Sequence, residues 1–323
     1  MHRLSPTTRY EKSVGSGILP YFEPLPPPAI RSSSSTSPFI SRGADYRYHL
    51  QRGNIFVETT GLPVDIDHYL RTQVFSVCNL YSCRDRLKAV SQRFLAQSRE
   101  LVKKSSGKTE WIELLHAVFE EIHPKRVTVV QGQGIPENPH PDISVGLTNE
   151  SLIEALEPLI NDEAEELLTS VQEKALNSDP HVGLSGLEFP FLLVEVVSAP
   201  DGGNLYQAQN RAAVSGTAAI QLRQFKSERD YIPNPASQDD VENLCHVIPR
   251  LAFSVTAEGP VHELWVHFQT LNGCFCMSCI GTWRTTVDDS AMEFLQHLYA
   301  VLQWGETEFV QAVAYDLTTY MEV

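Results

Sequence analysis

Residues 189–216 read FPFLLVEVVSAPDGGNLYQAQNRAAVSG, and this stretch decides the fold. The apolar run Phe189–Val197 is typical of a strand buried on both faces, and it contains one carboxylate, Glu195. A turn follows at Ala199–Gly203, and a helix with small residues on one face comes next. A lone acid in a central strand is costly unless a metal or a hydrogen-bonding group partners it. We therefore look for its partners elsewhere in the chain.

The composition is that of an ordinary globular protein, with 42% hydrophobic and 20% charged residues among 323. The net charge of −15 disfavours tight nonspecific binding to nucleic acid, without excluding a local basic channel. The N-terminus has no apolar signal region, and the chain has no apolar run of about 18 residues, so we expect no secretory signal and no membrane partner. We expect an intracellular protein of the cytoplasm or nucleus, whose six cysteines are reduced.

The chain divides into an N-terminal tail and one domain. Residues 1–53 are rich in proline and serine, so we expect a disordered tail that could dock a partner protein. Residues 54–323 are expected to form a single domain with a helical extension at its start. Helices are expected over Leu87–Val102, around Trp111–Phe119, over Ser151–Lys174 with Pro158 bending or dividing it, from the turn at Gly203 to about Arg229, and from a capping box at Ser290–Glu293. Strands are expected at Arg126–Gln131, Pro141–Leu147, Phe189–Val197, Leu251–Thr256, Glu263–Leu271 and Gly273–Trp283, with a hairpin turn at Glu258–Pro260.

Several common chemistries are disfavoured by spacing. The chain has no Gly-x-Ser-x-Gly elbow and no P-loop, and the pair Gly132 and Gly134 is followed by Glu137 where a dinucleotide fingerprint needs a third glycine. His262 and His267 fall on opposite faces of one strand, so they cannot share a metal. The cysteines at 274, 276 and 279 do not converge either, and we interpret them as reduced core residues.

Four residues remain as candidates for chemistry: Glu110, Asp142, Glu195 and Gln209. Asp142 opens one strand, Glu195 lies late in another, and the other two lie on the helices that precede and follow these strands. Hard oxygen ligands on adjacent strands suit Mg²⁺ or Mn²⁺, which could activate water and neutralise phosphate charge. The alternative is that Asp142 caps a turn and Glu195 pairs with a structural arginine.

These motifs, in order, resemble a fungal family of uncharacterised proteins with a PD-(D/E)XK nuclease-like domain. The resemblance rests on Thr109–Trp111, PDISVGL at 141–147, FPFLLVEVVS at 189–198, QNRAAVSG at 209–216 and the hairpin IPRLAFSVTAEGPVHELWVHF at 248–268, and it spans residues 55–315. It implies an α/β restriction-endonuclease-like core, with a central mixed sheet flanked by helices. It also implies that Glu110, Asp142 and Glu195 bind the metal and that Gln209 supports the site.

One departure weakens the expected activity. The family signature places a lysine two residues after the second acid, where this chain has Val197, and loss of such a group costs about 10²–10³ in rate. Lys174 and Lys226 have no evident route to the site, Arg211 is expected to turn away from Gln209 on the helix, and the cluster at Lys103, Lys104 and Lys108 is expected to be a solvated loop. The chain is then a divergent nuclease-like protein with weakened or lost Mg²⁺-dependent phosphodiester hydrolysis. The alternatives are a catalytically inactive binding or interaction module and a pocket repurposed for small-molecule chemistry.

Overall fold

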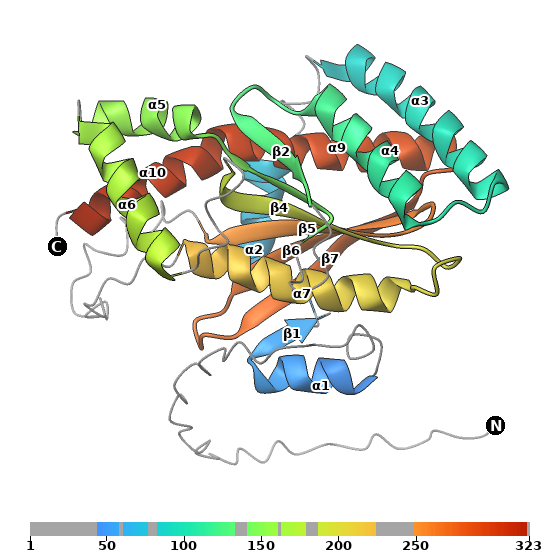
Figure 1. The fold of residues 1–323 in the computed structure, drawn as a ribbon, viewed down its shortest axis with the longest axis horizontal. Coiled ribbons are helices and arrows are strands. Elements are labelled where there is room, and N and C mark those ends of the chain that lie inside the picture. The colour runs from blue at the N-terminus through green and yellow to red at the C-terminus, as the bar shows by residue number, and fades with distance from the viewer. Residues whose placement is uncertain are drawn as a thin grey trace, which may run out of the picture. The chain divides into compact units, whose positions relative to one another are not determined.

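The computed structural model describes residues 44–57, 61–76, 83–132, 141–160, 163–178, 187–223 and 249–321. Within these ranges the chain is built on one seven-stranded mixed sheet with the strand order β1-β7-β6-β5-β4-β3-β2 (Figure 1). The strands are β1 (Ile55–Val57), β2 (Val127–Gln131), β3 (Ile143–Leu147), β4 (Glu188–Val197), β5 (Leu251–Glu258), β6 (Val261–Gln269) and β7 (Phe275–Arg284). The predicted mixed sheet flanked by helices is therefore confirmed.

Strand β4 lies near the middle of the sheet, between β3 and β5. It runs antiparallel to β3 and parallel to β5, and the hairpin partner β6 runs antiparallel to β5. Its apolar residues are buried on both faces, which explains why the sequence does not alternate there. Helix α7 (Leu205–Leu222) supplies the long crossover that a parallel β4–β5 pair requires.

The two faces of the sheet are covered by different sets of helices. Helix α7 and the short helix α1 (Ala44–Arg52) pack on one face, around Trp265 and Met277. The other face carries the larger hydrophobic core (Figure 1). The helices on that side are α2 (Val64–Tyr69), α3 (Arg84–Lys103), α4 (Lys108–Ile122), α5 (Asn149–Ile160), α6 (Ala164–Ser178), α9 (Asp288–Trp304) and α10 (Val310–Met321), with π-helical turns η2 (Leu70–Val74) after α2 and η7 (Gly305–Phe309) after α9.

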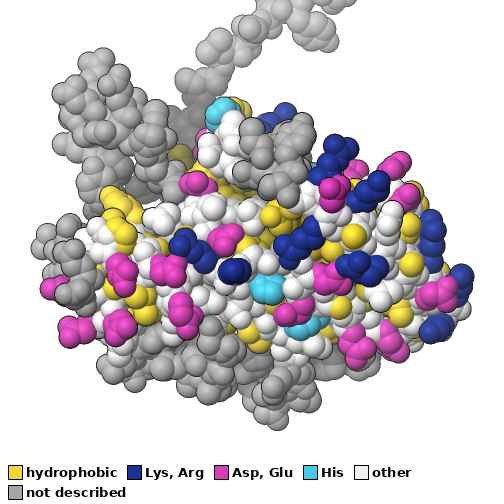
Figure 2. All heavy atoms as spheres, turned by 90° about the horizontal axis from the view of Figure 1, so that it is seen from above, with side chains coloured by type: hydrophobic (Ala, Val, Ile, Leu, Met, Phe, Trp, Pro, Cys, Tyr) yellow, Lys and Arg dark blue, Asp and Glu magenta, His cyan; other side chains and the backbone are white. Residues whose placement is uncertain are grey.

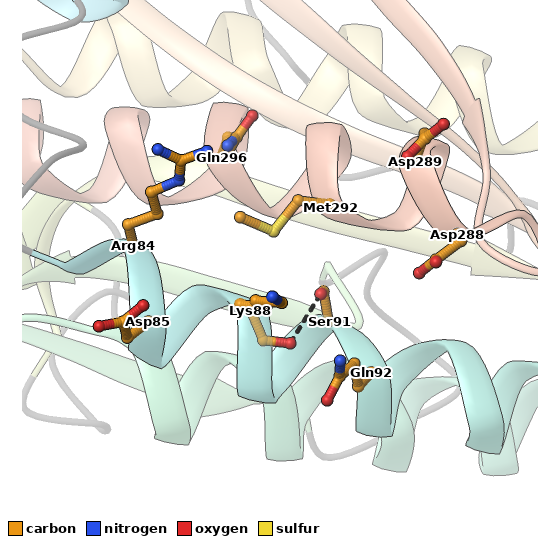
Figure 3. Close-up of a pocket in the computed structure, with 9 residues that line it drawn as sticks. All are labelled: Arg84, Asp85, Lys88, Ser91, Gln92, Asp288, Asp289, Met292 and Gln296. Atoms are coloured by element: carbon orange, nitrogen blue, oxygen red, sulfur yellow. Dashed lines mark hydrogen bonds between the residues drawn. The ribbon is translucent and has the colours of Figure 1, made fainter.

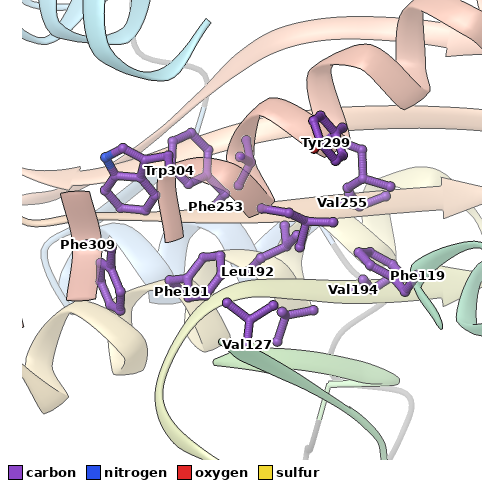
Figure 4. Close-up of a cluster of buried hydrophobic side chains, with 14 of the residues drawn as sticks. Phe119, Val127, Phe191, Leu192, Val194, Phe253, Val255, Tyr299, Trp304 and Phe309 are labelled. Carbon is purple, nitrogen blue, oxygen red and sulfur yellow. The ribbon is translucent and has the colours of Figure 1, made fainter. Parts of the chain in front are cut away.

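Aromatic rings fill the centre of the larger core (Figure 4). The ring centroids of Phe191 and Phe309 are 5.1 Å apart, and those of Phe253 and Trp304 are 5.2 Å apart. A side chain at Gly305 would overlap the Phe191 ring, so the π-helical turn passes over β4 only because residue 305 is glycine. This packing fixes the strand that carries Glu195 against the C-terminal helices.

The structure departs from the predicted elements at several points. Helix α1 lies inside the stretch predicted as a disordered tail. Arg47 anchors this helix to α7 by hydrogen bonds to Gln209 and Asn210. The rest of the predicted tail that precedes it, residues 1–43, lies outside the described residues. Pro158 lies inside α5, and the break between α5 and α6 comes after Ile160.

Two helix boundaries also differ from the predictions. The capping-box prediction is wrong, because α9 begins at Asp288 and Ser290 Oγ accepts from the Arg284 amide instead. Helix α7 ends at Leu222, and residues 224–248, which follow, are outside the described part of the chain.

Candidate functional site

Asp142 and Glu195 meet on neighbouring strands. Ile143 of β3 is paired with Val194 of β4, so Asp142, one residue before β3, stands beside Glu195. The Val196 amide donates a hydrogen bond to Asp142 Oδ2 at 2.7 Å, and the Asp142 amide donates to the Val194 carbonyl at 2.9 Å. Antiparallel pairing thus holds the Asp142 carboxylate against the backbone of the strand that carries Glu195.

A guanidinium group lies between the two acids. Arg211 projects from α7, with its Nε 3.1 Å from Glu195 Oε2 and its Nη2 3.8 Å from Asp142 Oδ2. The same Nη2 donates a hydrogen bond to the Val196 carbonyl at 2.8 Å. Three oxygens from two strands therefore surround one cation. Arg211 and Gln209 do have different partners, as their predicted divergence on the helix implies, but the flank of α7 that carries Arg211 faces the acid pair, so Arg211 reaches the site after all.

Glu195 is held from its other side by Ser215, one turn along α7 from Arg211. Ser215 Oγ donates to Glu195 Oε1 at 3.0 Å. The side chain of Glu195 is 2% exposed. Among the described residues, Glu195 Oε2 accepts no hydrogen bond and Arg211 Nε donates none. The two atoms are nevertheless in ionic contact. The carboxylate is thus hydrogen-bonded at one oxygen and held by the charge of Arg211 at the other.

Burial raises the pKa of Glu195 to about 7, with Arg211 opposing the shift and Asp142 adding to it. Removing a carboxylate from water disfavours its charged form, and a second acid alongside has the same effect. Glu195 consequently titrates near neutral pH. Tyr46 of α1 lies close enough to respond, since its pKa is raised by burial and then by the charge of Glu195.

Lys108 supplies a second cation. Its Nζ is 2.6 Å from Asp142 Oδ1, and it opens α4, the helix that packs on the opposite side of Asp142 from α7. The backbone amide of Lys108 donates to Asp201 Oδ2 at 2.6 Å, so the turn after β4 caps the start of α4. The expectation of a solvated loop is wrong for Lys108. Its spacing of three residues from the buried Trp111 is a signal for the sheet-facing side of the helix.

Glu110 and Gln209 have neighbours other than this acid pair. Glu110 is exposed on the first turn of α4, where its carboxylate borders Gly107 beside Asp201. In the described ranges, no three His, Cys, Asp or Glu side chains are grouped so that they could hold a metal. The role of Glu110 as a metal ligand stays a prediction.

Gln209 instead joins a second buried network on the same face of the sheet. It donates to Glu263 Oε2 at 2.9 Å and accepts from Arg47 at 2.5 Å. Thr256 Oγ1 and Trp265 Nε1 donate to the same oxygen of Glu263, at 2.8 and 3.0 Å. The pairing of β4, β5 and β6 sets Glu195, Thr256 and Glu263 in one row under α7, which separates Gln209 from Asp142.

The remaining candidates stay apart from the site. His262 packs against Phe94, Trp111 and Phe294 in the larger core. His267 forms a hydrogen bond with Ser254 Oγ under α7, so the two histidines do lie on opposite faces of the sheet. Four cysteines in the described part of the chain, including those at 274, 276 and 279, form no disulfide bond. Lys226 lies outside the described residues, and only the backbone of Lys174 is described.

A pocket of about 490 Å³ lies between α3 and α9, far along the chain from the acid pair (Figure 3). Basic side chains of α3 and acidic side chains at the start of α9 line it, together with Met292. Its lining contains none of the residues that surround Glu195. The mixed charges of this lining define no single class of ligand.

No family model, curated protein or solved structure matches this chain. None of the helices in the described ranges has the length and apolar character that a bilayer span requires.

Proposed function

We propose that the chain is a divergent PD-(D/E)XK nuclease-like protein that hydrolyses phosphodiester bonds slowly with Mg²⁺ or Mn²⁺. The order of its elements supports this core: α4, β2, β3, β4, α7 and β5, with β3 antiparallel to both neighbours and β4 parallel to β5. Asp142 and Glu195 come together on the two strands where the resemblance puts the metal-binding acids.

The position of Lys108 carries the proposal. Val197 cannot provide the ammonium group of the signature, but Lys108 Nζ lies 2.6 Å from Asp142 and is close enough to act on the pKa of Glu195. An ammonium at that place would orient a water molecule and stabilise negative charge that develops on phosphate. Lys108 is partly exposed, with 32% of its side chain accessible, so it can also reach a substrate.

The oxygens around Arg211 fit a divalent cation. Asp142 Oδ2, Glu195 Oε2 and the Val196 carbonyl already surround one positive group, and Glu195 Oε2 has no hydrogen bond within the described structure. Carboxylate and carbonyl oxygens are the ligands that Mg²⁺ and Mn²⁺ take. When bound there, the metal would lower the pKa of water and neutralise phosphate charge.

The charges on α3 support an anionic substrate despite the net charge of −15. Figure 2 shows Lys and Arg side chains gathered toward one end of the face seen from above, the end where α3 and α4 meet. Seven exposed cations lie on α3 and its C-cap against two exposed acids: Arg84, Arg86, Lys88, Arg93, Arg99, Lys103 and Lys104. Such a local basic surface attracts a phosphate backbone.

The second candidate is a catalytically inactive nuclease-fold module that binds a partner. The contacts of Arg211 and Lys108 favour it, because together they neutralise both acids without a metal. In that case Glu195 and Arg211 would be a structural ion pair, and the acids would serve to hold α7 on the sheet.

A nuclease assay on single- and double-stranded DNA and RNA with Mg²⁺ or Mn²⁺ tests the first candidate. We expect Asp142→Asn and Lys108→Met to abolish cleavage. The matched control is Lys104→Met, which removes a nearby exposed lysine for which the structure gives no contact with the acid pair. Cleavage that persists in Asp142→Ala and Glu195→Ala would reject the proposal. Absence of Mg²⁺ binding in calorimetry, with no cleavage by the wild type, would favour the inactive module.

A further inference from the structure

We infer that Arg211 is an internal counterion that competes with the divalent cation for the acid pair, so that Arg211, and not Val197, limits metal binding. The inference rests on the proposed function and concerns the control of that same site. It is carried by the three oxygen atoms that the guanidinium contacts or approaches on two strands.

Charge balance gives the first reason. With both acids ionised, Asp142 and Glu195 carry two negative charges, and Lys108 and Arg211 carry two positive ones. A divalent cation that entered this cluster would add two positive charges to a neutral site in a poorly solvated region. A metal on the oxygens that Arg211 approaches at 3.1 and 3.8 Å would lie next to the guanidinium, and like charges so close repel strongly where water is scarce, so the metal has to replace the guanidinium.

The way Arg211 is held gives the second reason. Its guanidinium makes one hydrogen bond at the site, to the Val196 carbonyl at 2.8 Å, and its Nε has no hydrogen bond despite the contact with Glu195. Charge therefore holds the side chain more than directed bonding does. The side chain is 24% exposed, which gives it a route to solvent.

The acids keep their places when Arg211 leaves. Ser215 Oγ still donates to Glu195 Oε1 at 3.0 Å, and the Val196 amide still donates to Asp142 Oδ2 at 2.7 Å. Both bonds are independent of the guanidinium. The departure of Arg211 would expose a preformed set of oxygens, which is the property that makes Arg211 a competitor rather than a structural brace.

A lysine in place of Val197 would not open the metal site. Its side chain is 4% exposed and packs against Gly203, where a built Cβ would lie 2.8 Å from Val197 Cβ. A lysine at 197 would have to displace the turn that leads into α7. Restoring the signature lysine is therefore expected to disturb the site, while removing Arg211 is expected to open it.

Calorimetric titration of the full chain with MgCl₂ and MnCl₂, together with the metal-dependent rise in melting temperature, tests the inference. We expect Arg211→Met to tighten metal binding about tenfold or more. This factor follows if Arg211 leaves the site open in about a tenth of the molecules or fewer, because the apparent affinity is reduced by the open fraction. Arg211→Gln is the second variant, because it keeps a donor for the Val196 carbonyl if the methionine variant does not fold. Arg47→Met is the matched control, since Arg47 contacts α7 through Gln209 and Asn210 and touches neither acid.

The outcomes separate this inference from the proposed function. Wild-type binding that Asp142→Asn abolishes but that neither Arg211 variant tightens would overturn the competitor role and leave the metal site intact. No metal binding by the wild type or by folded Arg211 variants would overturn both. Tighter binding in the Arg211 variants, lost again in Asp142→Asn combined with Arg211→Met, is the supporting result.

Discussion

The protonation of Glu195 makes a quantitative prediction about stability. Burial raises the pKa of this carboxyl from its ordinary value of 4.5 to about 7 in the folded chain. Between these two pH values the folded state holds a proton that the unfolded state has released. Because stability falls with rising pH wherever the folded state binds more protons, the contribution of Glu195 is fully present below pH 4.5 and is lost as the pH rises through 7.

The substitution Glu195→Gln removes this titration while keeping the shape of the side chain. The gap between about 7 and 4.5, at about 1.4 kcal/mol per pH unit, corresponds to roughly 3 kcal/mol. We expect the free energy of unfolding of Glu195→Gln minus that of the wild type to increase by about this amount between pH 4.5 and 8. Part of any constant offset will reflect the lost contact with Arg211.

Urea denaturation at half-unit pH steps measures this difference. The wild-type curve alone is not sufficient, because buried His262 and His267 have pKa values lowered to about 4 and about 3, and their contribution to stability rises with pH up to about 6.5. Both histidines are present in the variant, so the difference cancels them. A flat difference for Glu195→Gln, or one of the opposite sign, would refute the reasoning, since it would mean that Arg211 keeps Glu195 ionised.

Two further predictions concern the frame that holds the site. Asp316→Asn should destabilise the fold by about 3 kcal/mol or more, because it leaves Arg223, whose side chain is 3% exposed and pairs with Asp316 at 2.9 Å, as a buried charge without its partner. The control is Glu154→Gln, in the exposed pair with Arg126, which should change the free energy of unfolding by less than about 1 kcal/mol. Equal effects of Asp316→Asn and Glu154→Gln would contradict the burial argument. Gly216→Ala should destabilise by about 1–3 kcal/mol in thermal or urea unfolding despite the better helix propensity of alanine, because its methyl group would overlap the His267 ring. A more stable Gly216→Ala variant would show that α7 can move away from the sheet.

Local pattern was enough for the main elements of the fold. The unbroken apolar run around Glu195 predicted a central strand, and β4 is indeed flanked by β3 and β5. The stripe of Trp111 and its neighbours predicted α4, and the turn at Glu258–Pro260 predicted the β5–β6 hairpin. What escaped prediction was set by distant contacts. The three-residue strand β1 exists because it pairs with β7, and α10 continues from α9 through a π-helical turn packed on Phe191.

The candidate site divides in the same way. Hydrophobic periodicity and turn residues predicted the strand to which each of Asp142 and Glu195 belongs. That the two strands are neighbours was part of the shared-metal hypothesis, and the pairing of β3 with β4 shows it. Only the tertiary structure decided their partners: Lys108 and Arg211 join the acids, while Gln209 and Glu110 point to other neighbours. The physical reason is that helical spacing gives the direction of a side chain relative to its own helix. The rotation and placement of that helix on the sheet depend on packing, such as Gly216 against His267, and this packing turned the flank of α7 that carries Arg211 toward the acids.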